Sequence, residues 1–157
     1  MKNTNLTGGL FTRGKPQILK ESAKSRQQVT PEKHIQSAFI GWRDTFKRSF
    51  PILNSIFAVP NGFWTENKAY AAAMVKAGLT RGIQDLICLA PSACGKYHGL
   101  LIELKTESAS SKQSDEQLFF HKFFAELGYR TAVCRSAYQA SMLVNEHLNI
   151  RVPVYPR

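Results

Sequence analysis

The sequence contains no long apolar run and few cysteines. Its apolar stretches reach six or seven residues at most, whereas a membrane-spanning helix needs about 20, and no apolar signal core stands near the N-terminus. The three cysteines, Cys88, Cys94 and Cys134, lack a Cys-x-x-Cys spacing, and the four histidines show no metal-ligand spacing. We therefore expect no membrane association and no zinc site, and we interpret the cysteines as reduced thiols of a cytoplasmic protein.

Acidic residues are also scarce. The chain has 11 Asp and Glu against 21 Lys and Arg, a formal net charge of +10 over 157 residues. Such a surplus favours a phosphate-bearing partner, nucleic acid above all, although ribosome association or a well-solvated surface explains it too. The length predicts one domain, since domains cluster near roughly 100–150 residues.

The positive charge is dense at the beginning of the chain. Residues 1–29 carry six Lys or Arg and a single acid, Glu21, with few apolar residues. This composition is typical of a flexible arm, which either binds nucleic acid or a partner or is simply a solvated tail. We predict that residues 30–157 form the folded domain.

From Thr30 onwards the pattern alternates between helical and strand-like segments. Pro31 and Glu32 suit a helix start, and Ile35, Phe39, Trp42 and Phe46 recur at helical spacing. A second helix, at 114–127, opens with a Ser-x-x-Gln capping box and precedes Gly128. The remaining predicted elements are strands at 55–59, 83–90, 98–105 and 129–135, and helices at 65–77 and 136–148.

This order predicts a single α/β domain with a small mixed central sheet flanked by helices. The segment "PSACGKY" between strands 83–90 and 98–105 is short and bears Pro, Ser and Gly, as expected of an antiparallel hairpin. In such a hairpin Asp85 and Glu103 lie towards the same end. Side chains alternate along a strand, so Glu103 and Lys105 share one face. We therefore expect Asp85, Glu103 and Lys105 to converge.

Two interpretations of this convergence stand. In the first, the acids simply pair with lysine at a sheet edge, because unpaired buried charge costs several kcal/mol. Alternatively, Asp85, Glu103 and the backbone carbonyl of Leu104 form an oxygen site for Mg²⁺ or Mn²⁺. In that case the ion activates water and polarises a phosphate, while the Lys105 ammonium orients the nucleophile or neutralises developing charge.

The motifs around these residues, in this order, resemble a known family. "GLTRGIQDLICL", then "IELK", then "SDEQLFFHKFFAELGYRTAVCRS" are similar to the virus-type replication-repair nuclease (VRR-NUC) domain of the PD-(D/E)xK nuclease superfamily. The resemblance implies a restriction-endonuclease-like core. It also implies metal ligation by Asp85 and Glu103, a catalytic Lys105, and a site-facing Gln117.

The same resemblance implies an accessory acid on the first helix, here Glu32, which also suits the helix dipole. Gln117 has a second interpretation as the capping partner of Ser114. The family's proline before the aspartate is Gln84 here, a change that affects backbone stiffness more than chemistry. For phosphate contacts we expect Lys76, Arg81 and Lys96, although a generic solvated surface explains them nearly as well.

These features imply a Mg²⁺- or Mn²⁺-dependent DNA endonuclease without an organic cofactor. By resemblance we expect structure-selective cutting of branched DNA, as by Holliday-junction resolvases, by a homodimer in phage or prophage replication and repair. That places it in the bacterial cytoplasm or a phage-infected cell. Three alternatives remain: a restriction-type or nonspecific nuclease, a catalytically silent DNA- or RNA-binding module, and a structural protein whose acids only pair with lysines.

Overall fold

The computed structural model describes residues 31–59, 67–108 and 110–154. The predicted basic arm and Thr30 lie outside these residues. Among the helices described, none has the length and apolar character needed to cross a membrane. The elements follow the predicted order, with one addition, a 3-10 helix at Pro51–Ser55. It begins with a proline after the first helix and had no periodic signal in the sequence.

Four short strands form one sheet in the order β1-β2-β3-β4. β1 pairs with β2 and β2 with β3 in antiparallel register, whereas β3 and β4 are parallel. The hairpin prediction is therefore confirmed, with strands that are shorter than expected, because the ladder ends where the chain turns towards neighbouring loops. The strand bounds are β1 Ile56–Ala58, β2 Leu86–Cys88, β3 Leu100–Leu104 and β4 Arg130–Cys134.

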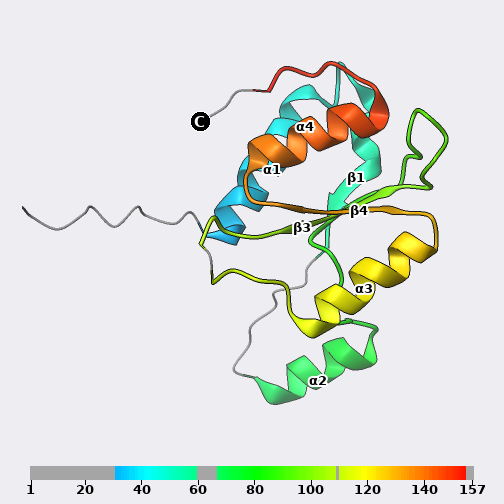
Figure 1. Ribbon diagram of the computed structural model, residues 1–157. Coiled ribbons are helices and arrows are strands. Elements are labelled where there is room, and N and C mark those ends of the chain that lie inside the picture. The colour runs from blue at the N-terminus through cyan, green and yellow to red at the C-terminus, as the bar shows by residue number, and fades with distance from the viewer. Residues whose placement is uncertain (1–30, 60–66, 109, 155–157) are drawn as a thin grey trace, which may run out of the picture.

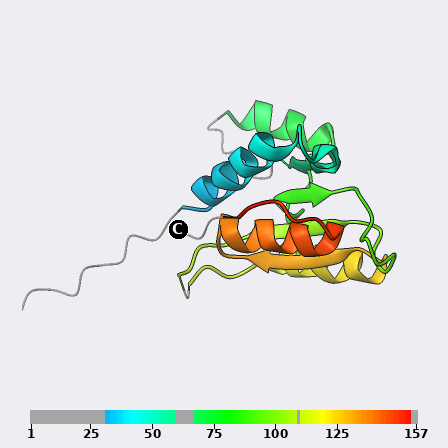
Figure 2. The ribbon, with the colours of Figure 1, turned by 90° about the horizontal axis from the view of Figure 1, so that it is seen from above.

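Helices cover both faces of the sheet (Figures 1 and 2). α1 and α4 pack against each other on one face. α3 connects β3 to the parallel strand β4 and lies on the other face. α2 lies below α3 in Figure 1 and buries none of its residues. The helix bounds are α1 Glu32–Phe46, α2 Lys68–Lys76, α3 Asp115–Glu126 and α4 Ala137–Leu148.

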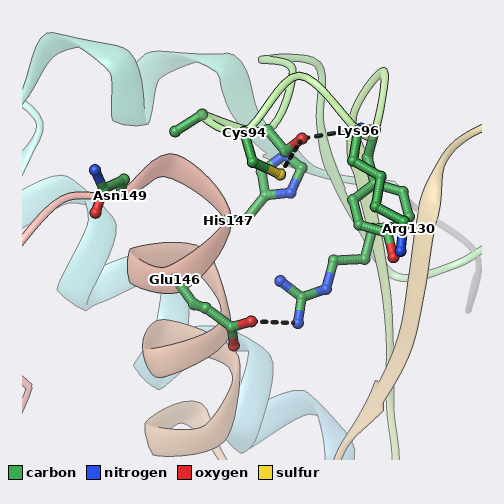
Figure 3. A pocket seen from close by; sticks show the side chains of 9 residues that line it. Cys94, Lys96, Arg130, Glu146, His147 and Asn149 are labelled. Carbon is green, nitrogen blue, oxygen red and sulfur yellow. Dashed lines mark hydrogen bonds and ion pairs between the residues drawn. The ribbon is translucent and has the colours of Figure 1, made fainter.

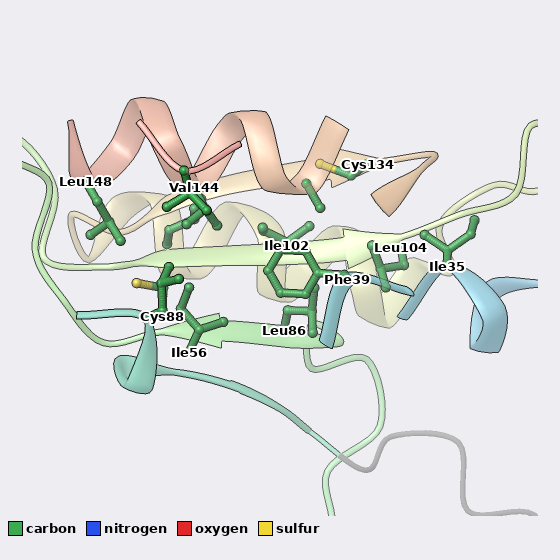
Figure 4. Close-up of a cluster of buried hydrophobic side chains, with 14 residues drawn as sticks. Ile35, Phe39, Ile56, Leu86, Cys88, Ile102, Leu104, Cys134, Val144 and Leu148 are labelled. Carbon is green, nitrogen blue, oxygen red and sulfur yellow. The ribbon is translucent and has the colours of Figure 1, made fainter. Parts of the chain in front are cut away.

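The hydrophobic core fills the layer between the sheet and the α1/α4 pair (Figure 4). Phe39 of α1 and Val144 of α4 meet Leu86 and Ile102, and all four are at most 1–2% exposed. β3 is the most enclosed strand, since each of its five residues is buried. Even-numbered residues of β3 enter this core, so Glu103 points to the opposite face, towards α3.

Candidate active site

Asp85 stands one residue before β2, next to the last residues of β3. Its carbonyl oxygen accepts a hydrogen bond from Val59 N–H at 2.9 Å, which keeps the backbone in line beside β1. Its side-chain Oδ2 accepts a hydrogen bond from Leu104 N–H at 2.7 Å. The carboxylate thus takes the place of a β2 carbonyl as partner of β3, and this ties Asp85 to the strand that carries Glu103.

Glu103 is fully buried at the centre of the sheet, with 0% exposure. Its Oε1 atom lies 2.9 Å from Lys105 Nζ and also accepts a hydrogen bond from Gln117 Nε2. The Oε2 atom is buried and has no hydrogen-bond partner among the residues described. A carboxylate oxygen without a partner in a buried position is costly, and a bound cation or an ordered water would satisfy it.

Lys105 has a second acidic neighbour at the end of the sheet. Its Nζ lies 3.6 Å from Oε1 of Glu32, at the first turn of α1. Ser111 Oγ donates a hydrogen bond to the same Glu32 oxygen at 3.1 Å. Glu32 is thus held near the site, as expected for an accessory acid, while its side chain stays 44% exposed.

Gln117 has both of the roles that the sequence left open. Its Oε1 accepts a hydrogen bond from Ser114 N–H at 2.9 Å and Ser114 Oγ accepts one from Gln117 N–H, which completes the capping box. Its Nε2 donates to Glu103. Because the capping box fixes the side chain at the first turn of α3, the amide is already oriented towards the carboxylate.

A close contact places the segment before Asp85 against the beginning of α3. Gly82 has φ +84°, and a Cβ there would lie 2.6 Å from Glu116 Cβ. Only glycine satisfies both the left-handed backbone and this approach. Gln84, by contrast, is fully buried with neither amide atom hydrogen-bonded among the described residues.

Burial dominates the protonation of the site. It raises the pKa of Glu103 to about 7, although Lys105 opposes the shift. It also raises the pKa of Asp85 against the opposing Leu104 hydrogen bond. For Lys105, burial alone would lower the pKa, but the hydrogen bond and charge of Glu103 outweigh it and the net shift is upward. Lys105 therefore stays an ammonium at neutral pH, beside a carboxyl that titrates there.

The donor set suits a hard cation. The Asp85 carboxylate lies close enough to Glu103 for its charge to add to the rise that burial causes in the Glu103 pKa. The N–H and C=O of one strand residue point the same way, so the Leu104 carbonyl lies on the Asp85 side of β3. Among the residues described, no group of three or more His, Cys, Asp and Glu gathers as a metal cluster. Two carboxylates and a carbonyl fit Mg²⁺, which retains several waters, and do not fit zinc.

The three expected phosphate contacts lie in different places. Arg81 lies near Glu116, in the first turn of α3: hydrogen bonds from the Glu116 backbone and from Ser114 lower the pKa of that carboxyl, and the Arg81 charge adds to the shift. Lys76 ends α2 and is exposed. Lys96 lies beside Arg130 and Glu146 at the opposite end of β3 and β4 (Figure 3). The structure therefore does not bring Lys96 to the site.

Sequence reasoning missed the support around Lys105. Arg135 follows β4, and its guanidinium donates hydrogen bonds to the carbonyl oxygens of Thr106 and Ser111. Ser111 Oγ accepts a hydrogen bond from Thr106 N–H at 3.2 Å, so this loop is closed on itself next to Glu32. No motif marks these residues, because the loop and β4 become neighbours only when the parallel strand pair forms.

The comparison with solved structures agrees with this architecture. No family model and no curated protein matches the sequence. Among solved structures, a "VRR_NUC domain protein" superimposes with a TM-score of 0.61 at 23% sequence identity, over 77% of this chain and 90% of the other. That likeness concerns the fold. The chain therefore has the VRR-NUC fold, a small single α/β domain with a mixed four-stranded sheet, as its sequence motifs predicted.

Proposed function

We propose that the protein is a Mg²⁺- or Mn²⁺-dependent endodeoxyribonuclease that hydrolyses phosphodiester bonds. One observation carries the proposal: Asp85 and Glu103 lie together beside Lys105, and the buried Oε2 of Glu103 has no partner among the described residues. If the acids served only to pair with lysine, both Glu103 oxygens would be expected to find donors. The fold and the net charge of +10 support the same conclusion.

In this proposal Asp85, Glu103 and the Leu104 carbonyl hold the metal ion. When bound, the ion supplies Lewis acidity to the phosphate and lowers the pKa of a water. Lys105 supplies a fixed positive charge and a hydrogen-bond donor for the attacking water or the charged transition state. Glu103 and Glu32 hold that ammonium in place. Gln117 fixes the rotamer of Glu103 by donating a hydrogen bond to the Oε1 atom of Glu103.

We further propose that the substrate is branched DNA, cut according to its structure by a homodimer in phage or prophage replication and repair. The resemblance of the motifs to the VRR-NUC family supports this part. The sequence supports it too, since we recognise no base-reading motif in it. Without such a motif, the shape of the DNA becomes the principal feature that the protein recognises. By the same proposal the protein works in the cytoplasm of a bacterium or of a phage-infected cell.

The decisive experiment is cleavage of a panel of labelled DNAs. Four-way junction, flap, splayed-arm, nicked and plain duplex substrates are incubated with Mg²⁺, Mn²⁺ or EDTA, with wild type, Glu103→Ala and Lys105→Ala. We expect metal-dependent cutting that both variants lose, with a preference for branched substrates. Equal cutting of every substrate would instead favour a nonspecific or restriction-type nuclease.

A silent nucleic-acid-binding module is the second candidate. It is favoured by the basic composition alone and predicts DNA binding with no cutting under any metal condition. Residues 1–29 belong to this question as a proposed binding arm. Removing them should weaken DNA affinity and reduce its salt dependence, since each Lys or Arg contact to phosphate releases counterions. Unchanged affinity and salt slope would exclude the arm from binding.

A further inference from the structure

A second concave surface adjoins Lys105, outside the site described above. It encloses about 600 Å³ and lies between the loop after β3, the first turn of α3 and the end of β4. Three cationic side chains and three polar ones line it: Lys105, Lys112, Arg135, Ser111, Gln113 and Gln139. We call this surface the Lys112 pocket. Because Lys105 belongs to both, the pocket opens directly beside the proposed catalytic centre.

The charge of the Lys112 pocket has one sign. None of the described residues that line it is a carboxylate. Among the described residues, the Arg135 guanidinium donates to backbone carbonyls, and neither Arg135 nor Lys112 forms an ion pair. Lys105 is balanced by Glu103 and Glu32, so Lys112 and Arg135 are the cations that give this surface a positive potential, and this potential concentrates anions there.

Two amide side chains of the lining have donors to offer. Gln113 lines the pocket, and its Nε2 is buried with no acceptor among the described residues. Gln139 uses its Oε1 to accept from Arg135 N–H at 2.7 Å, so the group it has left to offer is its Nε2 donor. Amide donors beside Lys112 and Arg135, which have no ion pair with a described residue, favour a ligand rich in acceptor oxygens, of which phosphate is the commonest.

One side of the pocket is apolar. Leu118 of α3 and Val133 of β4 complete the lining, and they are 43% and 36% exposed. An inorganic anion gains nothing from such a surface, whereas the sugar that accompanies each phosphate of a nucleic acid does, because it buries carbon against carbon. The combination of cations, donors and an apolar side therefore fits a nucleotide unit better than a free ion.

We propose that the Lys112 pocket binds the phosphodiester group next to the scissile one on the substrate strand. This inference rests on the proposed nuclease function and adds a subsite to it. Lys112 makes the ionic contact to the phosphate, Gln113 donates a hydrogen bond, and Leu118 and Val133 carry the sugar. Arg135 holds the loop wall through the carbonyls of Thr106 and Ser111. The subsite contributes uniform binding and carries no sequence preference.

The test removes one charge from the protein and one from the DNA. Lys112→Ala is compared with Lys96→Ala, an equal charge change at an exposed lysine at the opposite end of β3 and β4. Each DNA substrate carries one neutral methylphosphonate in place of a phosphate, and its position is moved in turn to each side of the cleaved bond. For wild type we expect the methylphosphonate at one of these positions to raise KM about 10-fold, the usual order for a lost charged contact, and to leave kcat unchanged.

Lys112→Ala should raise KM to a similar extent on unmodified DNA. The slope of its log affinity against log salt concentration should fall by about one. The methylphosphonate at that position should cause no further rise in the KM of this variant. Lys96→Ala should behave as wild type. If wild type cuts and the two variants are indistinguishable, the pocket inference is wrong and the nuclease stands. If wild type never cuts, but Lys112→Ala alone weakens binding of the same DNA in EDTA, the nuclease proposal fails and the phosphate pocket stands.

Discussion

Asp85 and Leu104 are joined by a hydrogen bond of 2.7 Å from the Leu104 N–H to Oδ2 of Asp85. The carboxylate therefore serves the sheet and the proposed metal site at once. A substitution can separate the two roles, since asparagine keeps an acceptor oxygen at the same place and loses the charge.

The first prediction follows from this pair. Asp85→Asn should fold with nearly wild-type stability and lose metal-dependent cleavage, while Asp85→Ala should also lose about 1–3 kcal/mol of stability, because the Leu104 N–H is left without its partner. Urea unfolding in EDTA and cleavage assays check the two effects separately. Full activity in Asp85→Asn would show that the charge is not used in catalysis.

Gln117 and Ser114 provide a matched pair for the second prediction. Gln117→Ala should lower cleavage at least 10-fold, because the variant removes the hydrogen bond that orients Glu103. Ser114→Ala should cost about 1 kcal/mol of stability by removing the helix cap and should retain activity. Equal activity losses in the two variants would mean that the helix end matters, not the Gln117 amide.

The third prediction concerns pH. The pKa of Glu103 is about 7 in the folded, metal-free protein against 4.5 for a free carboxyl. Between these values the folded state holds a proton that the unfolded state has released. Stability from this group is therefore complete below about pH 4.5, falls as pH rises to 7 and stays low above it.

Glu103→Gln removes this titration. In EDTA we expect the variant to gain stability relative to wild type as pH rises from 5 to 8, on the order of 3 kcal/mol for a pKa of about 7 against 4.5. Urea unfolding of both proteins at each pH measures the difference. A constant difference across the range would show that Glu103 ionises as an ordinary carboxyl.

Ser111 tests the support of Lys105. Ser111→Ala removes the hydroxyl that donates to Glu32 and accepts from Thr106 N–H. Glu32 should then hold the Lys105 ammonium less firmly, and kcat should fall roughly 2- to 5-fold with KM unchanged. Ser110→Ala is the control, since its hydroxyl bonds only Ser108 within the same loop. A similar loss in both variants would point to loop stability instead.

The cysteines give a prediction that is independent of activity. Cys94 is exposed, and a hydrogen bond from Ser92 heads the interactions that lower its thiol pKa. Burial raises the pKa of Cys88, and that of Cys134 to about 11. We expect one fast-reacting thiol in the native protein and three in guanidinium, with the fast one lost in Cys94→Ser. Three fast thiols in the native state would contradict the buried positions.

Local pattern determined much of this protein. Alternation along β3 is enough to place Glu103 and Lys105 on one face, and the hairpin connection brings Asp85 to the same end. The order of the predicted elements and the Ser114 capping box were likewise found in the structure. These features depend on backbone geometry over a few residues, and sequence encodes such geometry directly.

The tertiary structure alone decided the rest. Gln117 reaches Glu103 only because α3 crosses the face of β3, and Arg135 meets the Ser111 loop only because β4 pairs in parallel with β3. The same pairing sends Lys96 to the far end of the sheet and leaves Lys112 beside Lys105. Distances between side chains on separate elements depend on sheet order and helix packing, and no local pattern in the sequence contains them.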